Sequence, residues 1–155
     1  MHERAVAVEW SKRLTVVANG HYRAALRYSK FKSWLGVPTI LLATIVGTSV
    51  FANLQEKPEI GWQITIGIMS ITAAVLSALQ SFLNYGEKAE KHRTAGARYN
   101  AVGRELEQLL AQNDDWSSLA SIRERIDKLA NDSPHIPEAV HQEMSKIPVE
   151  PLWKE

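Results

Sequence analysis

The sequence predicts an all-α membrane protein built around a two-helix transmembrane hairpin. Residues 35–54 and 60–83 form two runs that contain no Asp, Glu, Lys, Arg or His. At about 1.5 Å per helical residue, each run is long enough to cross a hydrocarbon core roughly 30 Å thick. Residues 55–59 alone separate the runs, so the two helices must be antiparallel. The alternative is a pair of buried helices in a soluble bundle, but uncharged apolar runs of about 18 residues are rare in soluble cores.

Composition excludes several classes of function. The 155-residue chain has a formal net charge of +1, which gives no reason to expect nucleic-acid binding. It has no Cys, which excludes disulfides, thiolate zinc sites and Cys nucleophiles. The N-terminus does not predict a signal peptide, because the first apolar run begins only at Leu35, after a long charged segment. The hairpin is therefore expected to insert as an internal membrane segment.

The distribution of Lys and Arg predicts the orientation of the hairpin. Basic residues flank it on both sides, at Arg23, Arg27, Lys30, Lys32, Lys88, Lys91, Arg93 and Arg98. The connecting loop has Lys57 as its one basic residue, together with two Glu. The positive-inside rule then places both termini in the cytoplasm and the loop outside. Aromatic residues suited to interfacial anchoring stand near the ends of the spans, at Phe31, Trp34, Trp62 and Tyr85.

Residues 1–34 predict an amphipathic helix, or two short ones. Apolar residues recur at three-to-four spacing at Val6, Trp10, Leu14 and Val17. Residues 19–20, an Asn-Gly pair, are expected to break the helix. Two placements are open: the segment lies on the inner leaflet, attracted to anionic lipid, or it packs on the downstream helices. Packing is favoured slightly, because Tyr and Ala rather than large aliphatic residues dominate its second half.

The first span carries two local signals. Pro38 falls in its predicted first turn, where the missing N–H costs little. Ala43 and Gly47 are small residues four positions apart, a spacing that lets another helix approach closely in lipid.

A polar stripe follows the whole length of the second span. Its small and polar residues recur at alternating four- and three-residue steps, which place them on one helical face: Gln63, Gly67, Ser70, Ala74, Ser77, Ser81 and Asn84. Polar side chains that face lipid are costly, so this stripe should face protein or water. Two interpretations stay open. The stripe is a helix-packing seam formed by Ser and Gly, which the residues alone favour, or it is the lining of a pore in an oligomer.

The helical pattern continues past residue 83 and predicts a cytoplasmic stalk helix over residues 84–112, continuous with the second span. A stalk seam with seven-residue recurrence, which marks supercoiled helix contacts, runs along it: Tyr85, Ala89, His92, Gly96, Tyr99, Gly103 and Leu106. This seam suggests self-association of the chain.

The steps of the polar stripe also extend to Lys88, Lys91 and Arg98. If the stripe lines a conduit, these cations would ring its cytoplasmic mouth and enrich anions there. The commoner role for such residues is a solvated surface, or one that faces lipid headgroups.

Two further helices are expected. Residues 113–115, Asn-Asp-Asp, form a turn and N-cap signal. The apolar periodicity that follows predicts an amphipathic return helix over residues 115–130, which folds back along the stalk. Residues 131–155 are expected to hold a short helix that Pro137-Glu138 opens, and then an irregular tail.

No constellation in the sequence supports catalysis or metal binding. His141 and Glu138 lie three residues apart, but no second His at metal-ligand spacing accompanies them. His92 is isolated on the stalk seam, where a structural hydrogen-bonding role is the commoner one. The chain has no glycine-rich phosphate loop and no Ser–His–acid signature. The sequence therefore predicts no enzyme activity, no catalytic, cofactor-binding or metal-binding residues, and no cofactor.

Several local matches accompany the two spans. They are residues 21–25 (HYRAA), 80–83 (QSFL), 87–93 (EKAEKHR), Tyr99, 104–107 (RELE), 123–127 (RERID) and 133–137 (SPHIP). In this combination and order the chain resembles the SLATT family, bacterial two-transmembrane effector domains. The resemblance covers nearly the whole chain, so residues 1–155 are expected to form a single domain.

The resemblance implies an effector in the bacterial inner membrane that acts in antiviral defence or cell suicide. Family members are proposed to form pores when a nucleotide signal arrives from an associated synthetase or sensor. The sequence shows no such partner domain, so a sensor or synthetase is expected to act in trans. Two functions remain: an oligomeric pore or ion channel, or a non-conducting anchor or scaffold whose cytoplasmic helices bind a partner. The expected partners are the lipid bilayer and further copies of the chain, together with that sensor or synthetase, and not nucleic acid.

Overall fold

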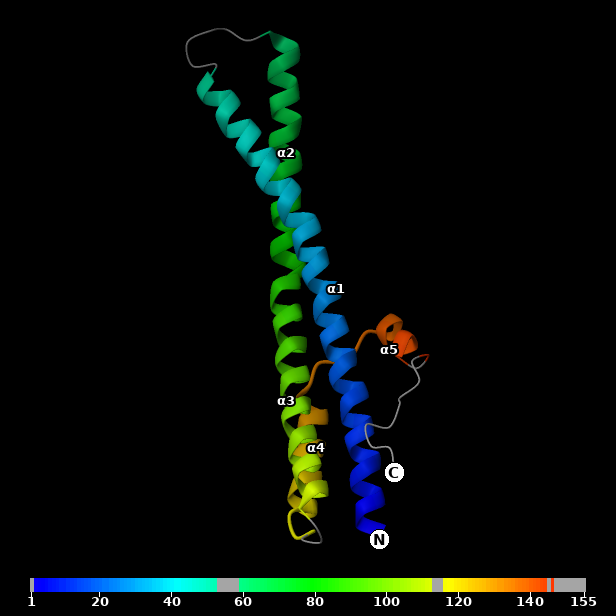
Figure 1. Ribbon diagram of the computed structural model, residues 1–155. Coiled ribbons are helices and arrows are strands. Elements are labelled where there is room, and N and C mark those ends of the chain that lie inside the picture. The colour runs from blue at the N-terminus through cyan, green and yellow to red at the C-terminus, as the bar shows by residue number, and fades with distance from the viewer. Residues whose placement is uncertain (1, 53–58, 113–115, 145, 147–155) are drawn as a thin grey trace. The chain divides into compact units, whose positions relative to one another are not determined.

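The computed structural model describes residues 2–52, 59–112, 116–144 and 146 (Figure 1). Five helices follow one another: α1 (His2–Ala52), α2 (Ile60–Leu83), α3 (Tyr85–Ala111), α4 (Leu119–Asp132) and α5 (Glu138–Met144). Helices account for 91% of these described residues and strands for none, which confirms the all-α class. Two of the helical stretches are long and apolar enough to cross a membrane, judged by length and composition.

The chain divides into two compact units. The polar unit comprises Met1–Arg27 and Lys88–Glu155, and the apolar unit comprises Tyr28–Glu87. Helix α1 gives its first half to the polar unit and the rest to the apolar unit. Helix α3 begins in the apolar unit and continues into the polar one. The described parts of both uncharged runs therefore lie in the apolar unit.

Helix α1 runs through the Asn-Gly pair at residues 19–20, so the predicted break is wrong. Gly20 is buried, and a Cβ on it would lie 3.0 Å from Cδ1 of Ile136. The glycine therefore serves a close packing contact and not a turn. Asn19 is exposed and stays helical. Packing of α1 against its neighbours overrides the local preference of this pair for turns.

Pro38 lies in the interior of α1 and not in a first turn. The sequence placed a helix start near residue 35, whereas the helix begins at His2. A proline in the interior has no N–H to donate to the carbonyl four residues earlier, which typically costs about 3 kcal/mol or more. Here that carbonyl belongs to Trp34, just before the uncharged run.

The second helix is interrupted at Asn84, so the prediction of one continuous helix from residue 60 to residue 112 is also wrong. Asn84 separates α2 from α3 and has a left-handed backbone, with φ 44° and ψ 45°. Asn enters this region more readily than most residues that carry a Cβ. Its backbone N–H donates to the Gln80 carbonyl at 3.2 Å, and its side-chain amide donates to the Glu87 carboxylate.

The core of the polar unit lies between α1, α3 and α4. Buried apolar residues from these helices form one cluster: Ala7, Leu14, Ala18, Tyr99, Val102, Leu106, Leu109 and Ile122. The N-terminal part of α1 thus packs on the downstream helices, which is the placement that the sequence favoured.

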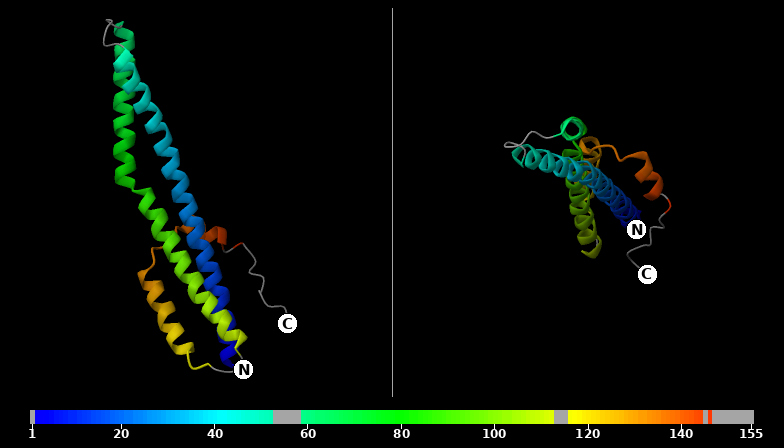
Figure 2. Two further views of the ribbon diagram at one scale, coloured as in Figure 1. Left: turned by 60° about the vertical axis from the view of Figure 1, so that its left-hand side comes forward. Right: turned by 90° about the horizontal axis from the view of Figure 1, so that it is seen from above.

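Helices α4 and α5 complete the polar unit. Helix α4 runs back along α3 (Figure 2), and the Arg125 guanidinium donates to the Glu105 carboxylate, with one bond of 2.9 Å. Helix α5 packs through Val140 and Met144 on Ala24 of α1. The predicted cap at residues 113–115 lies outside the described residues, as does most of the predicted loop at residues 55–59.

Candidate functional site

Helix α2 packs on α1 through one face. Half-buried apolar and amide residues recur along it at three-to-four spacing: Ile66, Met69, Ala73, Leu76, Gln80 and Leu83. A Cβ on Gly36 of α1 would lie 3.4 Å from the side-chain amide of Gln80. Just beyond α2, the rings of Tyr28 and Phe31 stack on Tyr85 with centroids 5.9 and 5.5 Å apart. Contacts with α1 therefore cover this face of α2.

The polar stripe lies beside the face that packs on α1 and not within it. At about 100° per residue, the centre of the stripe lies roughly 100° around the helix from that face. Ser70 is half-buried, and the other stripe residues are exposed: Gln63, Gly67, Ala74, Ser77, Ser81 and Asn84. The stripe is therefore not a seam between α1 and α2 of one chain. It is a polar surface in the apolar unit, and the described residues leave most of it exposed.

The rest of α2 is suited to lipid. Its aliphatic residues Ile64, Ile68, Ile71, Val75 and Leu79 are 43% to 67% exposed. Within the chain, 6% of the most apolar stretch of each long helix is buried, whereas the core helix of a soluble protein would be mostly buried. Hydroxyls outside the stripe are bonded to backbone: Thr65 donates to the Gly61 carbonyl at 2.9 Å and Thr72 to the Ile68 carbonyl at 2.8 Å.

Two glycines leave room for the close approach of another helix. A Cβ on Gly67 of α2 would meet no described neighbouring side chain or helix within 4 Å, and the same holds for Gly47 of α1. Gly67 belongs to the polar stripe, and Gly47 belongs to the small-residue pair with Ala43, which is exposed. Small residues at such positions are typical of contacts between membrane helices.

The stalk seam, in contrast, is used inside the chain. Tyr85 is half-buried and the other seam residues are buried: Ala89, His92, Gly96, Tyr99, Gly103 and Leu106. A Cβ on Gly96 would lie 3.2 Å from the carbonyl oxygen of Ala18 on α1. The seven-residue recurrence therefore reports the contact of α3 with α1, and the seam is not free to join a second copy. The cations Lys88, Lys91 and Arg98 are exposed on α3, in the polar unit.

His92 has a partner that sequence spacing did not reveal. Its Nδ1 lies 3.0 Å from Nδ1 of His21, 71 positions earlier, and both side chains are buried, at 3% and 2% exposure. One ring donates and the other accepts, and Tyr99 stacks on His21 with centroids 5.4 Å apart. Burial, and next the neighbouring His92, lowers the pKa of His21 to about 4, and burial lowers the pKa of His92. The pair is therefore neutral at pH 7.

The described residues hold no group of three or more His, Cys, Asp or Glu that could bind a metal ion. Fold and site together define an all-helical membrane protein with two spans and an uncovered polar face on the second. The chain belongs to the SMODS and SLOG-associating 2TM effector domain family 4, whose sequence model matches residues 9–142. This match confirms the resemblance to the SLATT family. No curated protein and no solved structure matches the chain.

Proposed function

We propose that this effector assembles with further copies of itself so that the polar stripes face a common axis and enclose an ion path. The observation that carries the proposal is the exposure of Ser77, Ser81 and their stripe neighbours in an otherwise apolar unit. Hydroxyls and amides in contact with acyl chains are costly, so an uncovered polar face favours assembly. A single two-span chain cannot surround a water path, so conduction requires an oligomer.

In this proposal the spans form a hairpin with both termini in the cytoplasm of a bacterial cell, and α3 belongs to a cytoplasmic stalk. The basic residues at both ends of the hairpin support that orientation. A sensor or synthetase that acts in trans supplies the signal, in keeping with the association that the family description names. The cell loses its membrane gradient when the assembly opens.

Induced expression with a potential-sensitive dye tests the pore. We expect depolarisation with the wild-type chain and a several-fold weaker response with Ser77→Leu or Ser81→Leu. A leucine side chain at either position would exclude water from the ion path and narrow it. Thr72→Leu is the matched control, since it removes a hydroxyl outside the stripe that is bonded to its own helix. Equal conduction by Ser77→Leu, Ser81→Leu and Thr72→Leu would show that the stripe is not the lining.

A thiol-accessibility measurement separates a wetted stripe from a dry packing seam. The chain has no Cys, so a single introduced thiol reports one position. We expect Ser77→Cys to react with a membrane-impermeant thiol reagent in the open assembly, and Val75→Cys to stay unmodified. Protection of both thiols while the cells depolarise would assign the stripe to helix packing and the ion path to another surface.

The same assembly is proposed to prefer anions, with Lys88, Lys91 and Arg98 near its cytoplasmic mouth. Clustered cations raise the local anion concentration through electrostatic focusing. Reversal potentials in reconstituted bilayers under a salt gradient measure the preference directly. Clear cation selectivity would remove this part of the proposal and leave the pore itself standing.

The alternative function is a non-conducting anchor whose helices bind a partner protein. It is favoured by a hollow of about 650 Å³ in the polar unit, between the start of α1 and α4. Trp10 and Trp116 contribute aromatic surface to it, and Glu3, Arg123, Glu124 and Asp127 contribute charge. Expression that leaves the membrane potential unchanged, but retains a partner on the membrane, would support the anchor and contradict the pore.

A further inference from the structure

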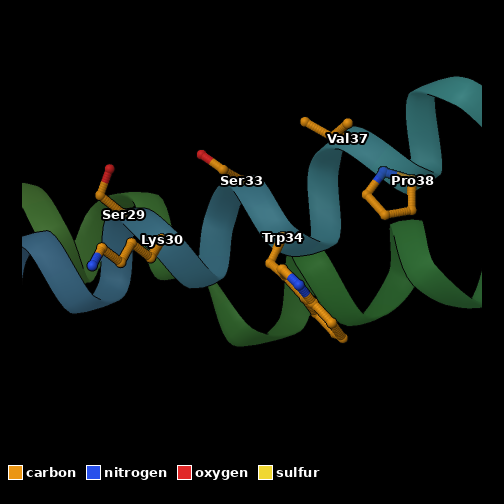
Figure 3. Close-up of a pocket in the computed structure, with 6 residues that line it drawn as sticks. All are labelled: Ser29, Lys30, Ser33, Trp34, Val37 and Pro38. Atoms are coloured by element: carbon orange, nitrogen blue, oxygen red, sulfur yellow. The ribbon is translucent and has the colours of Figure 1, made fainter.

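A groove of about 580 Å³ runs along α1 where the charged part of the helix meets the uncharged run. Its lining consists of two parallel rows of side chains spaced four residues apart. One row is Ser29, Ser33 and Val37, and the other is Lys30, Trp34 and Pro38. In Figure 3, Ser29, Ser33 and Val37 point to one side of α1, whereas Trp34 and Pro38 point to another.

Both rows change from polar to apolar in the same direction. Along one row the side chains carry a hydroxyl, a second hydroxyl and an isopropyl group. Along the other they carry an ammonium group, an indole and a pyrrolidine ring. The change takes eight residues, which is about 12 Å of helix and comparable to the distance from a lipid phosphate into the upper acyl chains. The groove therefore matches an amphiphile that lies along the helix axis.

The charged and polar groups of the groove determine which charge that amphiphile carries. Lys30 supplies an ammonium, Ser29 and Ser33 supply hydroxyl donors, and Trp34 supplies an indole N–H. Among the described residues, the six that line the groove include no acidic side chain. This set of donors suits a phosphate oxygen, to which charge-assisted hydrogen bonds are the stronger kind.

We propose that this groove binds one anionic phospholipid of the leaflet at this end of the span. The phosphate lies against Lys30 and Ser33, and the start of an acyl chain lies against Val37 and Pro38. Trp34 and Val37 are 79% and 55% exposed within the chain. In a membrane protein, aromatic and apolar side chains exposed near the end of a span contact lipid. The apolar end of the groove makes a lipid, and not a free phosphate ion, the occupant. The inference rests on the membrane location and does not require the pore.

Native mass spectrometry of the full chain in detergent tests the site, with phosphatidylglycerol and phosphatidylcholine as the probes. We expect retention of one phosphatidylglycerol in preference to phosphatidylcholine. Lys30→Gln should weaken its retention roughly tenfold, which is the loss expected for one charge-assisted contact. Ser33→Ala should weaken it less, because a neutral donor contributes less.

Lys32→Gln is the matched control, because it removes the same charge two residues away. The Lys32 ammonium lies 3.5 Å from the place of a Cβ on Gly86, and Lys32 does not line the groove. We expect this variant to retain phosphatidylglycerol as the wild type does. If Lys30→Gln and Lys32→Gln lose phosphatidylglycerol equally, the effect comes from the overall positive charge and not from the groove. If Lys30→Gln loses none, the groove is not the binding site. Displacement of the lipid by millimolar glycerol phosphate would show that the groove recognises phosphate alone.

Discussion

Gly96 lies at a close contact between α3 and α1. A Cβ on it would lie 3.2 Å from both the Ala18 carbonyl oxygen and the Tyr22 ring, whereas a Cβ on Gly103 would meet no described neighbour within 4 Å. Both glycines are buried on the same helix, so they form a matched pair. The seven-residue repeat of the sequence treats them alike, and only the packing of α1 distinguishes them.

We expect Gly103→Ala to stabilise the fold by about 1 kcal/mol, because alanine is the better helix former. Gly96→Ala should be destabilised by about 1 kcal/mol or more, because the added methyl group pushes against backbone. Thermal unfolding of the detergent-solubilised chain measures both changes. A gain in stability from Gly96→Ala equal to that from Gly103→Ala would mean that α1 and α3 are not in close contact at Gly96.

The buried histidine pair predicts a loss of stability in acid. The folded pKa of His21, about 4, lies below the unfolded value of 6.5, so the unfolded chain binds more protons between these values. Stability from this group is therefore present above pH 6.5 and is lost as the pH falls toward 4. We expect the midpoint of thermal unfolding to be about 5 °C lower at pH 5 than at pH 7.

The double variant His21→Phe, His92→Leu should lose most of this pH dependence. His141→Gln is the control, because His141 is exposed on α5. This variant should keep the pH dependence of the wild type. Retention of the full acid effect in the double variant would assign it to other titrating groups.

At the scale of elements, the break between α2 and α3 depends on one residue. Asn84 holds a left-handed backbone that a residue with a branched or apolar side chain adopts at a cost of about 1–2 kcal/mol. It ends the second span and also belongs to the polar stripe. The periodicity of the sequence continues across it, which is why periodicity alone predicted one helix.

We expect Asn84→Gly to retain the stability of the wild type within about 0.5 kcal/mol, because glycine adopts the same backbone conformation without strain. Asn84→Ala should lose about 1 kcal/mol in thermal unfolding, since its methyl group disfavours that conformation. Greater stability of Asn84→Ala than of Asn84→Gly, with a gain in helical circular dichroism, would show that α2 and α3 can join into one helix.

In helix α1, local sequence signals predict interruptions that the structure does not have. The Asn-Gly pair at residues 19–20 predicts a break, and the first span is predicted to begin near residue 35, yet the helix is continuous from His2 to Ala52. The contact of Gly20 with Ile136 and the burial of His21 and Ala24 hold the segment helical. Long-range packing decides such positions because local preferences amount to about 1 kcal/mol per residue.

At the scale of the whole molecule, the uncovered polar stripe predicts which surface joins copies of the chain. We expect Ser77→Cys to form disulfide-linked dimers in native membranes under mild oxidation, since facing stripes bring equivalent positions together. Val75→Cys, which is 53% exposed on the aliphatic face, is the control and should stay monomeric on non-reducing gels. Cross-linking of Val75→Cys alone would place the interface on the aliphatic face.

The sequence by itself determined the class of the protein. The length of the two uncharged runs, the short loop between them and the placement of the charges outside them predict two apolar helices. These features suffice because the hydrophobic effect depends on how apolar a segment is, whichever residues it contacts. It also determined the polar stripe, since helical periodicity is a local property. The tertiary structure alone decided which surfaces are already used. It placed α1 against the stalk seam, paired His21 with His92 and left the polar stripe uncovered, because a contact between residues 71 positions apart depends on packing that no local pattern encodes.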